Sequence, residues 1–235
     1  MNNFRKIILC VLFFHCLHSL SALDVQITGK ELGFDVTTEY NRSLIFCGST
    51  AVSGALKINN HHTVKGGFIL GALGDTFEMT IFSSAHYTPL LSEQRLGISL
   101  AYAYNGLPGP AYNIHSHALL PYVSFNGRRA GFSLGTNLRF TRFFGEQAIF
   151  EPMLSFSGYV NIINNEKIRI GIISANFDDY LMGNMGAYFL RLNGIVHITQ
   201  QWYITSEITL MQSGSVALSS TFYGIAYRGG VRFRW

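Results

Sequence analysis

Apolar and polar residues alternate along most of this chain, and the alternation predicts β-strands. In residues 31–40, for example, Leu32, Phe34 and Val36 alternate with polar neighbours. Successive side chains of a strand point to opposite faces, so a period of two gives each strand one apolar face. Eleven further segments show the pattern, although one of them, His115 to Phe125, is weaker and contains proline. Twelve strands are therefore predicted, with ten strands, through one merged or missed hairpin, and then eight as alternatives.

The connections between these segments alternate in length. Short turns with the sequences NNHH, NGR, NNEK and TQQ alternate with longer connections such as Asn105–Asn113, Ala175–Asn184 and Met211–Ser219. Short turns at one end and longer loops at the other are typical of a membrane barrel whose two termini share a side. Two connections depart from this rule, since the one near Asn41 is tight and the segment TPLLSEQ is long for a turn.

Charged residues fall on the face opposite the apolar row in nearly every segment. Gly, Ser, Ala and Thr fill much of the same face, and they suit a crowded polar lumen better than a solvated outer surface. Nine cations and six anions are expected to line that lumen: Glu31, Asp35, Glu39, Lys57, Lys65, Glu78, Arg95, Arg139, Glu151, Arg169, Arg191, Glu207, Arg228, Arg232 and Arg234.

The composition supports a barrel in a membrane. Charged residues make up 13% of the chain, well below the ordinary share for a soluble domain, while aromatic residues reach 14%. Beyond the N-terminal segment no run of 18 apolar residues occurs, which excludes membrane-spanning helices. A closed barrel is the other structure that satisfies its backbone in lipid. The fold expected is an all-β, single antiparallel transmembrane β-barrel. The pI near 9.0 does not indicate nucleic acid, because no Lys/Arg cluster accompanies it.

The N-terminal segment has the layout of a secretory signal peptide. Arg5 and Lys6 precede an apolar run, and small residues follow it, so residues 1–22 are expected to be removed, leaving a barrel of residues 23–235. Cys10 and Cys16 lie inside this segment. Cys47 is then the single cysteine of the mature chain, which excludes an intramolecular disulfide.

The C-terminal segment YRGGVRFRW resembles the recognition signal of bacterial outer-membrane β-barrel proteins. The signal would consist of the alternate apolar residues Tyr227, Val231, Phe233 and Trp235. The resemblance implies a place in the bacterial outer membrane among its lipids, with the barrel-assembly machinery and periplasmic chaperones as partners. The length is similar to that of small porin-like channels and of OmpW-like barrels, although OmpW-like barrels have eight strands.

Closure of the barrel would place the last strand antiparallel to the first. Arg228, Arg232 and Arg234 would then pass the acidic residues Glu39, Asp35 and Glu31, respectively. One hypothesis is that these charges neutralise one another and hold the seam closed. The other is that the excess arginine lines a pore and favours anionic solutes.

Two further groups of residues raise other possibilities. His115 and His117 would share a face while Ser116 points the other way, an arrangement that cannot place a serine nucleophile beside its base. No metal site and no cofactor are expected. Aromatic residues near one membrane boundary, namely Trp202, Tyr203, Tyr227 and Trp235, are expected to form an interfacial girdle.

These patterns favour a narrow, porin-like channel for passive passage of small hydrophilic solutes. The first alternative is a structural or surface-interaction barrel whose lumen is filled by its own side chains. An outer-membrane lipid-modifying enzyme is the second alternative, and the main expectation is that the protein is not an enzyme. The oligomeric state does not follow from the sequence.

Overall fold

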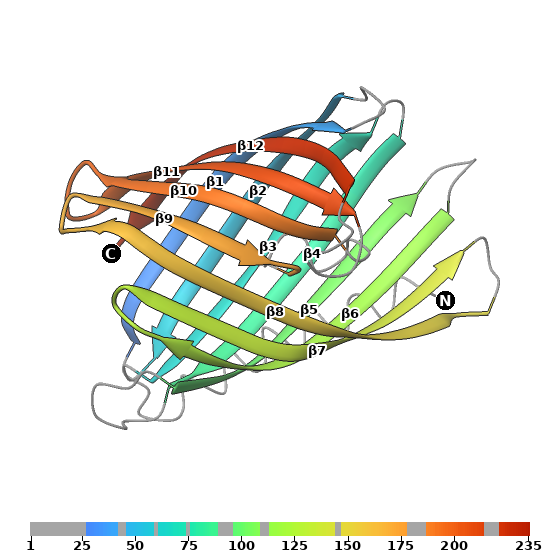
Figure 1. The fold of residues 1–235 in the computed structure, drawn as a ribbon, viewed down its shortest axis with the longest axis horizontal. Coiled ribbons are helices and arrows are strands. Elements are labelled where there is room, and N and C mark those ends of the chain that lie inside the picture. Colours follow the sequence, from blue (N-terminus) through green and yellow to red (C-terminus); the bar gives the residue numbers. More distant parts are fainter. Residues whose placement is uncertain are drawn as a thin grey trace.

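The alternating segments form a single closed β-barrel in a computed structural model, which describes residues 27–41, 46–58, 61–73, 76–88, 96–108, 113–143, 147–177, 187–213 and 221–235 (Figure 1). The predicted all-β fold and the predicted number of twelve strands are confirmed. The strands are β1 (Ile27–Asn41), β2 (Phe46–Ile58), β3 (His62–Leu73), β4 (Thr76–Tyr87), β5 (Leu96–Pro108), β6 (Asn113–Asn126), β7 (Ala130–Phe143), β8 (Ile149–Asn164), β9 (Ile168–Ala175), β10 (Ala187–His197), β11 (Trp202–Ser213) and β12 (Thr221–Arg234).

Each strand pairs antiparallel with its sequence neighbours, and β1 pairs with β12 to close the barrel. The seam runs from Glu31 opposite Arg234 to Asn41 opposite Gly224. The backbone of Lys30 exchanges two hydrogen bonds of 3.0 Å with Trp235, so the start of β1 and the end of β12 lie at one end of the barrel, here called the terminal end. The opposite end is called the loop end. Closure leaves no edge strand exposed.

The outer wall of the barrel is apolar and the inner wall is polar. Leu154, Ile162 and Ile98 are 64%, 62% and 58% exposed, whereas the inward Asp35 and Arg139 are 1% and 3% exposed. A continuous belt of aliphatic side chains is unfavourable in contact with water, so the outer wall requires an apolar environment. No helix long and apolar enough to cross a membrane occurs in the part of the chain that the structure describes.

Strand alternation places the charged residues of the described strands on the inner wall, with two exceptions. Lys30 faces outward at the terminal end and Arg142 faces outward near the loop end. Charged side chains on the outer wall of a membrane barrel are costly at mid-depth and nearly neutral close to the interfaces. The positions of Lys30 and Arg142 follow this rule.

The weakly predicted segment with proline is a complete strand, β6. Its ladder with β7 is interrupted between Leu119 and Tyr122, where Pro121 offers no N–H. Across the strand pair, a Cβ at Gly135 would overlap the carbonyl oxygen of Pro121. Glycine therefore lets the two backbones approach closely at the point where the ladder is broken.

Several predictions fall outside the described residues. The signal peptide of residues 1–22, with Cys10 and Cys16, lies there, and so does Arg95. The backbone of Cys47 belongs to β2, but its side chain is not described.

Candidate functional site: the barrel lumen

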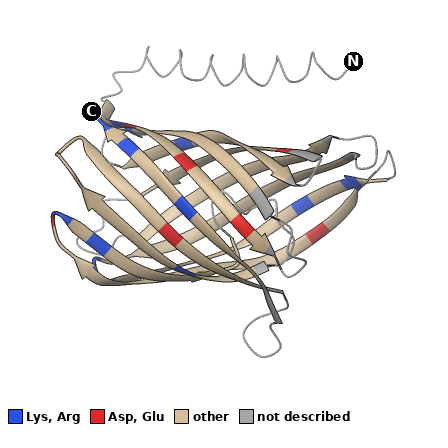
Figure 2. Cartoon of the chain, turned by 90° about the horizontal axis from the view of Figure 1, so that it is seen from above, with Lys and Arg blue, Asp and Glu red and all other residues tan. Residues whose placement is uncertain are grey.

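Charged residues of both signs are distributed over many strands of the barrel (Figure 2). Strand alternation and register place fourteen of the predicted lumen residues on the inner wall: Glu31, Asp35, Glu39, Lys57, Lys65, Glu78, Arg139, Glu151, Arg169, Arg191, Glu207, Arg228, Arg232 and Arg234. Eight of them are cations and six are anions.

Two ion pairs cross the seam between β1 and β12. Arg232 Nη2 donates to Asp35 Oδ2 at 2.7 Å, and Arg234 Nη2 donates to Glu31 Oε2 at 3.0 Å. Both pairs were predicted from the antiparallel closure. They differ in burial, because the side chain of Arg232 is 13% exposed and that of Arg234 is 55% exposed. Loss of one partner is therefore expected to cost more in the buried pair than in the exposed one.

Glycine makes room for the buried pair. Gly230 lies directly opposite Asp35, and a Cβ there would overlap the carboxylate. Gly33 lies opposite Arg232, and a Cβ at Gly33 would lie 2.6 Å from the guanidinium carbon. The segment YRGGVRFRW thus combines the arginine with the small residue that the seam requires.

The third predicted seam pair, Arg228 with Glu39, is wrong. Arg228 Nη1 donates to Glu207 Oε2 at 3.1 Å, on the neighbouring strand β11. The reason is register: Arg228 lies directly opposite Glu207 and Thr37, whereas Glu39 lies two residues further along, opposite Ala226.

Glu207 is shared by two arginines. Arg191 Nε lies 3.6 Å from Glu207 Oε2 and also donates to Thr209 Oγ1 at 2.9 Å. Arg228 Nε donates to Thr37 Oγ1 at 3.3 Å. Two guanidinium groups therefore face one carboxylate on this part of the inner wall.

Other inward charges are less concentrated. Arg139 lies directly opposite Glu151 across β7 and β8 and is almost fully buried. Glu78 accepts a hydrogen bond of 2.7 Å from Asn105 Nδ2.

A cavity of about 530 Å³ lies among β8, β9, β10 and the β6–β7 turn, toward the terminal end. Its polar lining comes from Arg128, Arg169, Tyr159, Asn161, Asn164 and Asn193. Asn161 and Asn164 hold the turn by donating to the carbonyl of Arg128 at 3.0 Å and 2.8 Å. Arg169 is exposed to this cavity, in contrast to the buried Arg139 and Arg191. This cavity at the terminal end is thus lined largely by amide and arginine side chains.

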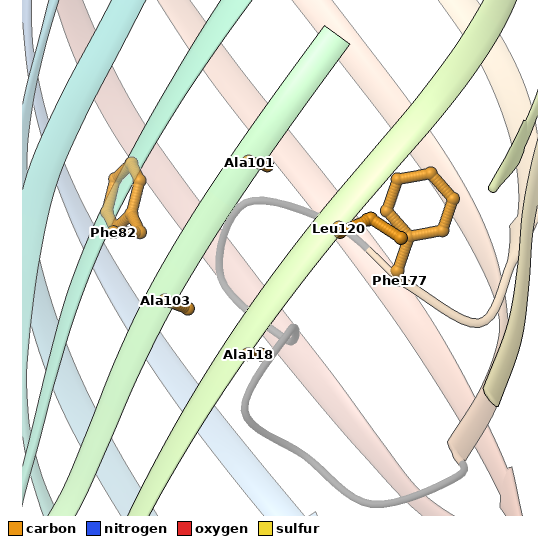
Figure 3. Packing of buried hydrophobic residues seen from close by; sticks show 6 residues of the cluster. All are labelled: Phe82, Ala101, Ala103, Ala118, Leu120 and Phe177. Carbon is orange, nitrogen blue, oxygen red and sulfur yellow. The ribbon is translucent and has the colours of Figure 1, made fainter. Parts of the chain in front are cut away.

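An apolar cluster narrows the lumen further in. Phe177 follows β9 directly and packs inside the barrel with Leu120 and Phe82, beside the small residues Ala101, Ala103 and Ala118 (Figure 3). Its ring also lies 5.4 Å from that of Tyr122. In the sheet β6 and β9 are separated by β7 and β8, so Phe177 reaches β6 through the interior. The alternation pattern did not predict this residue, because it follows the strand.

The predicted aromatic girdle is partly wrong. Trp202, Phe233 and Trp235 stack on the outer wall at the terminal end, with ring centroids 4.7 Å and 5.2 Å apart. Tyr203, however, faces the lumen, where its ring lies 5.3 Å from the guanidinium of Arg234. Tyr227 is exposed on the outer wall in the middle of β12, opposite Thr38 and Ile208.

The predicted separation of Ser116 from its two histidine neighbours is present. Ser116 is buried on the inner wall, 3.3 Å from the hydroxyl of Thr141. His115 and His117 face outward, where each ring nitrogen Nδ1 lies 2.8 Å from a tyrosine hydroxyl. No group of three or more His, Cys, Asp or Glu that could hold a metal ion occurs within the described ranges.

Comparison of sequences adds no relative, since no protein-family model and no curated protein sequence matches the chain. Solved structures do match. The translocator domain of the autotransporter NalP from Neisseria meningitidis has a TM-score of 0.56 and 14% identity, over 97% of this chain and 96% of that one. The NanC porin has a TM-score of 0.53 and 12% identity, over 85% of this chain and 98% of that one.

The KdgM porin, solved in complex with disordered oligogalacturonate, has a TM-score of 0.52 and 12% identity, over 86% of this chain and 98% of that one. Likeness at these identities shows architecture and not activity. In closed topology, polar lumen and apolar outer wall, the chain has the fold of the bacterial outer-membrane β-barrels.

Proposed function

We propose that this chain is an outer-membrane channel for passive passage of small hydrophilic solutes, with a preference for anions. The observation that carries the proposal is the separation of the two walls: the charged residues of the described strands face inward, save one at each rim, and the outer wall is apolar. The shared fold with the KdgM and NanC porins supports it. Twelve strands also give a lumen between that of eight-stranded barrels, which side chains fill, and that of 16-stranded porins.

Passage of solutes is tested by swelling of liposomes that contain the purified barrel. Uncharged sugars of increasing size are expected to enter at falling rates, because the lumen is narrowed by Phe177 and Leu120. Liposomes containing folded barrel that swell no faster than empty liposomes would contradict the proposal.

The anion preference rests on the inner-wall arginines. Arg191 and Arg228 share one carboxylate, and Arg169 is exposed at the terminal-end cavity. Rings of cationic side chains favour anions in pores. Arg169→Glu is expected to shift the reversal potential in a KCl gradient toward cations, whereas Lys30→Glu, which makes the same charge change on the outer wall, is expected to leave it unchanged. An equal shift of the reversal potential in both variants would show that Arg169 does not line the solute path.

A specific observation also favours the closed, structural barrel. Phe177 lies inside the barrel beside Leu120, in an apolar cluster that also contains Phe82, and so fills part of the interior with apolar side chains. In that case neither the folded wild-type protein nor the variants Arg169→Glu and Lys30→Glu would carry a measurable current.

We also propose that the barrel is not a lipid hydrolase. The hydroxyl of Ser116 is buried on the inner wall, and the rings of His115 and His117 lie on the opposite face. Turnover of phospholipid by the purified barrel that is lost in His117→Ala would overturn this view.

The remaining expectations concern export and assembly. We propose that residues 1–22 are a cleaved signal peptide and that Val231, Phe233 and Trp235, with Tyr227, serve as an assembly signal for the barrel-assembly machinery. In support, Tyr227, Val231 and Trp235 are exposed on the outer wall.

A further inference from the structure

Five polar side chains lie together on the outer wall of β5, β6 and β7, near the loop end. They are Tyr102, Tyr104, His115, His117 and Arg142, here called the outer polar patch. Register places Tyr104 opposite His117, and His115 opposite Arg142. Their strand neighbours Ala101, Ala103, Ser116, Ala118 and Thr141 are buried on the inner side, which fixes the patch on the outer wall.

Hydrogen bonds between tyrosine and histidine fix the rings of this patch. Tyr102 Oη lies 2.8 Å from His117 Nδ1, and Tyr104 Oη lies 2.8 Å from His115 Nδ1. The ring of Tyr104 also lies 5.1 Å from that of His117, between centroids. A tyrosine hydroxyl that donates to Nδ1 leaves the proton of a neutral imidazole on Nε2. Neither Nε2 has a hydrogen-bond partner among the described residues, so two oriented N–H donors remain for an external acceptor.

The patch lies at the upper boundary of the apolar wall. His115 is the third residue of β6 and Arg142 the last but one of β7. Toward the terminal end, the outward positions of the same strands become aliphatic, with Leu100, Leu119 and Leu138. Arg142 is the outward cation nearest the loop end in the described strands, so a guanidinium group and two N–H donors lie next to a hydrocarbon-compatible surface.

We propose that the outer polar patch binds the phosphate of a glycolipid of the lipopolysaccharide type in the outer leaflet, with its acyl chains against Leu100, Leu119 and Leu138. A guanidinium forms short, charge-assisted hydrogen bonds to phosphate oxygens. The imidazole N–H groups complete the cradle, and the aliphatic residues below match the lipid tail. The site rests on the proposed outer membrane and on an orientation in which the loop end faces the outside of the cell, but it does not depend on conduction through the lumen.

The test is native mass spectrometry of the folded, full barrel in detergent, titrated with bis-phosphorylated lipid A. Wild type is expected to retain one lipid A at low concentration. Arg142→Gln and the double variant His115→Phe/His117→Phe are each expected to need about tenfold more lipid for the same occupancy, as for a lost charge-assisted bond. Lys30→Gln, which removes the outward cation at the terminal end, is the matched control and is expected to bind as wild type does.

Three outcomes would overturn the site. Equal retention of lipid A by wild type and Arg142→Gln would show that the guanidinium of Arg142 does not bind the phosphate. Equal binding of fully dephosphorylated lipid A to wild type would show that the acyl chains bind without phosphate recognition. A loss of lipid A binding in Lys30→Gln as large as that in Arg142→Gln would show a general effect of charge.

Tyr102→Phe/Tyr104→Phe keeps the rings and removes the hydroxyls, so it is expected to weaken binding of lipid A without unfolding the barrel.

Discussion

At the seam between β1 and β12, two glycines make room for a buried ion pair that accompanies the backbone ladder. Arg232 and Asp35 pair at 2.7 Å, with Gly33 and Gly230 leaving space for their side chains. Neighbouring Arg234 and Glu31 make an ion pair of similar length that is largely exposed. Removal of one partner from a buried pair leaves a charge without compensation, which costs several times more than loss of an exposed pair. The two pairs therefore provide an internal comparison at the scale of single residues.

Arg232→Gln is expected to lower the free energy of unfolding by about 3 kcal/mol, because Asp35 would remain buried and charged. Arg234→Gln is expected to cost less than about 1 kcal/mol. Both values would be measured by urea unfolding in lipid vesicles, followed by tryptophan fluorescence. Equal losses of unfolding free energy in the two variants would show that the Arg232–Asp35 pair does not stabilise the seam more than the Arg234–Glu31 pair does.

Exchange of the two charges gives an independent check on the same pair. Arg232→Glu is expected to lower the heat resistance of the folded barrel on gels, and Asp35→Arg added to it is expected to restore part of that resistance. Absence of any restoration would mean that the pair acts through geometry that the exchanged side chains cannot reproduce.

The adjacent glycines Gly229 and Gly230 predict opposite responses to alanine. A Cβ at Gly230 would overlap Asp35 and approach Thr205 to 2.8 Å, whereas a Cβ at Gly229 would meet nothing within 4 Å. Gly230→Ala is therefore expected to destabilise the barrel by about 1 to 3 kcal/mol, as overpacking does. Gly229→Ala is expected to be neutral or slightly stabilising, because alanine reduces the entropy of the unfolded chain. The same urea unfolding measures both, and a similar loss at Gly229 would count against the crowded seam.

At the scale of elements, β9 is the shortest strand and its end determines the shape of the lumen. Where its backbone pairing with β8 stops, the side chain of Asn176 continues the ladder: its Oδ1 accepts from Phe156 N at 2.8 Å and its Nδ2 donates to the carbonyl of Leu154 at 2.8 Å. The backbone N–H of Asn176 also donates to the carbonyl of Phe156 at 3.1 Å, so the chain stays on the wall through Asn176, and the next residue, Phe177, turns inward to β6. The constriction is thus a consequence of an early strand end.

Phe177→Ala is expected to raise the single-channel conductance, because it removes a large ring from the narrowed part of the lumen. Phe132→Ala, which removes an equally large ring from the outer wall where Phe132 is 58% exposed, is the matched control and should leave conductance unchanged. An unaltered conductance in Phe177→Ala would show that the narrowest part of the lumen does not lie at Phe177.

The sequence predicted the strands well because a period of two is a local property that each segment carries by itself. It also predicted that Arg228 faces inward and that His115 and His117 share a face. It did not predict the partner of Arg228 or the hydrogen bonds of the two histidines, because partners depend on the register between strands, which a segment does not contain. Tyr203 was assigned to the girdle from its place near a strand end, although the alternation of β11 turns it inward. The inward turn of Phe177 depends on where β9 ends, and residues beyond a strand carry no alternation.

At the scale of the whole molecule, the barrel separates an apolar outer surface from a polar, charged interior. The apolar outer wall requires lipid, and the inner wall retains charge and hydrogen-bonding groups away from it. Closure between β1 and β12 completes every backbone ladder and encloses the lumen. The inner-wall cations exceed the anions by two among the described residues, and the outer polar patch lies at one rim. A channel with lipid bound on its wall is the function that this separation supports.

We propose that the lumen is an open path through the barrel. Recording of purified, folded wild-type protein in a planar lipid bilayer tests for this path, with folding verified by heat-modifiable mobility of the same preparation. An open lumen is expected to give stable, stepwise single-channel currents that persist at constant voltage. A folded preparation that inserts and stays silent would contradict it and would favour a barrel closed by Phe177 and its neighbours.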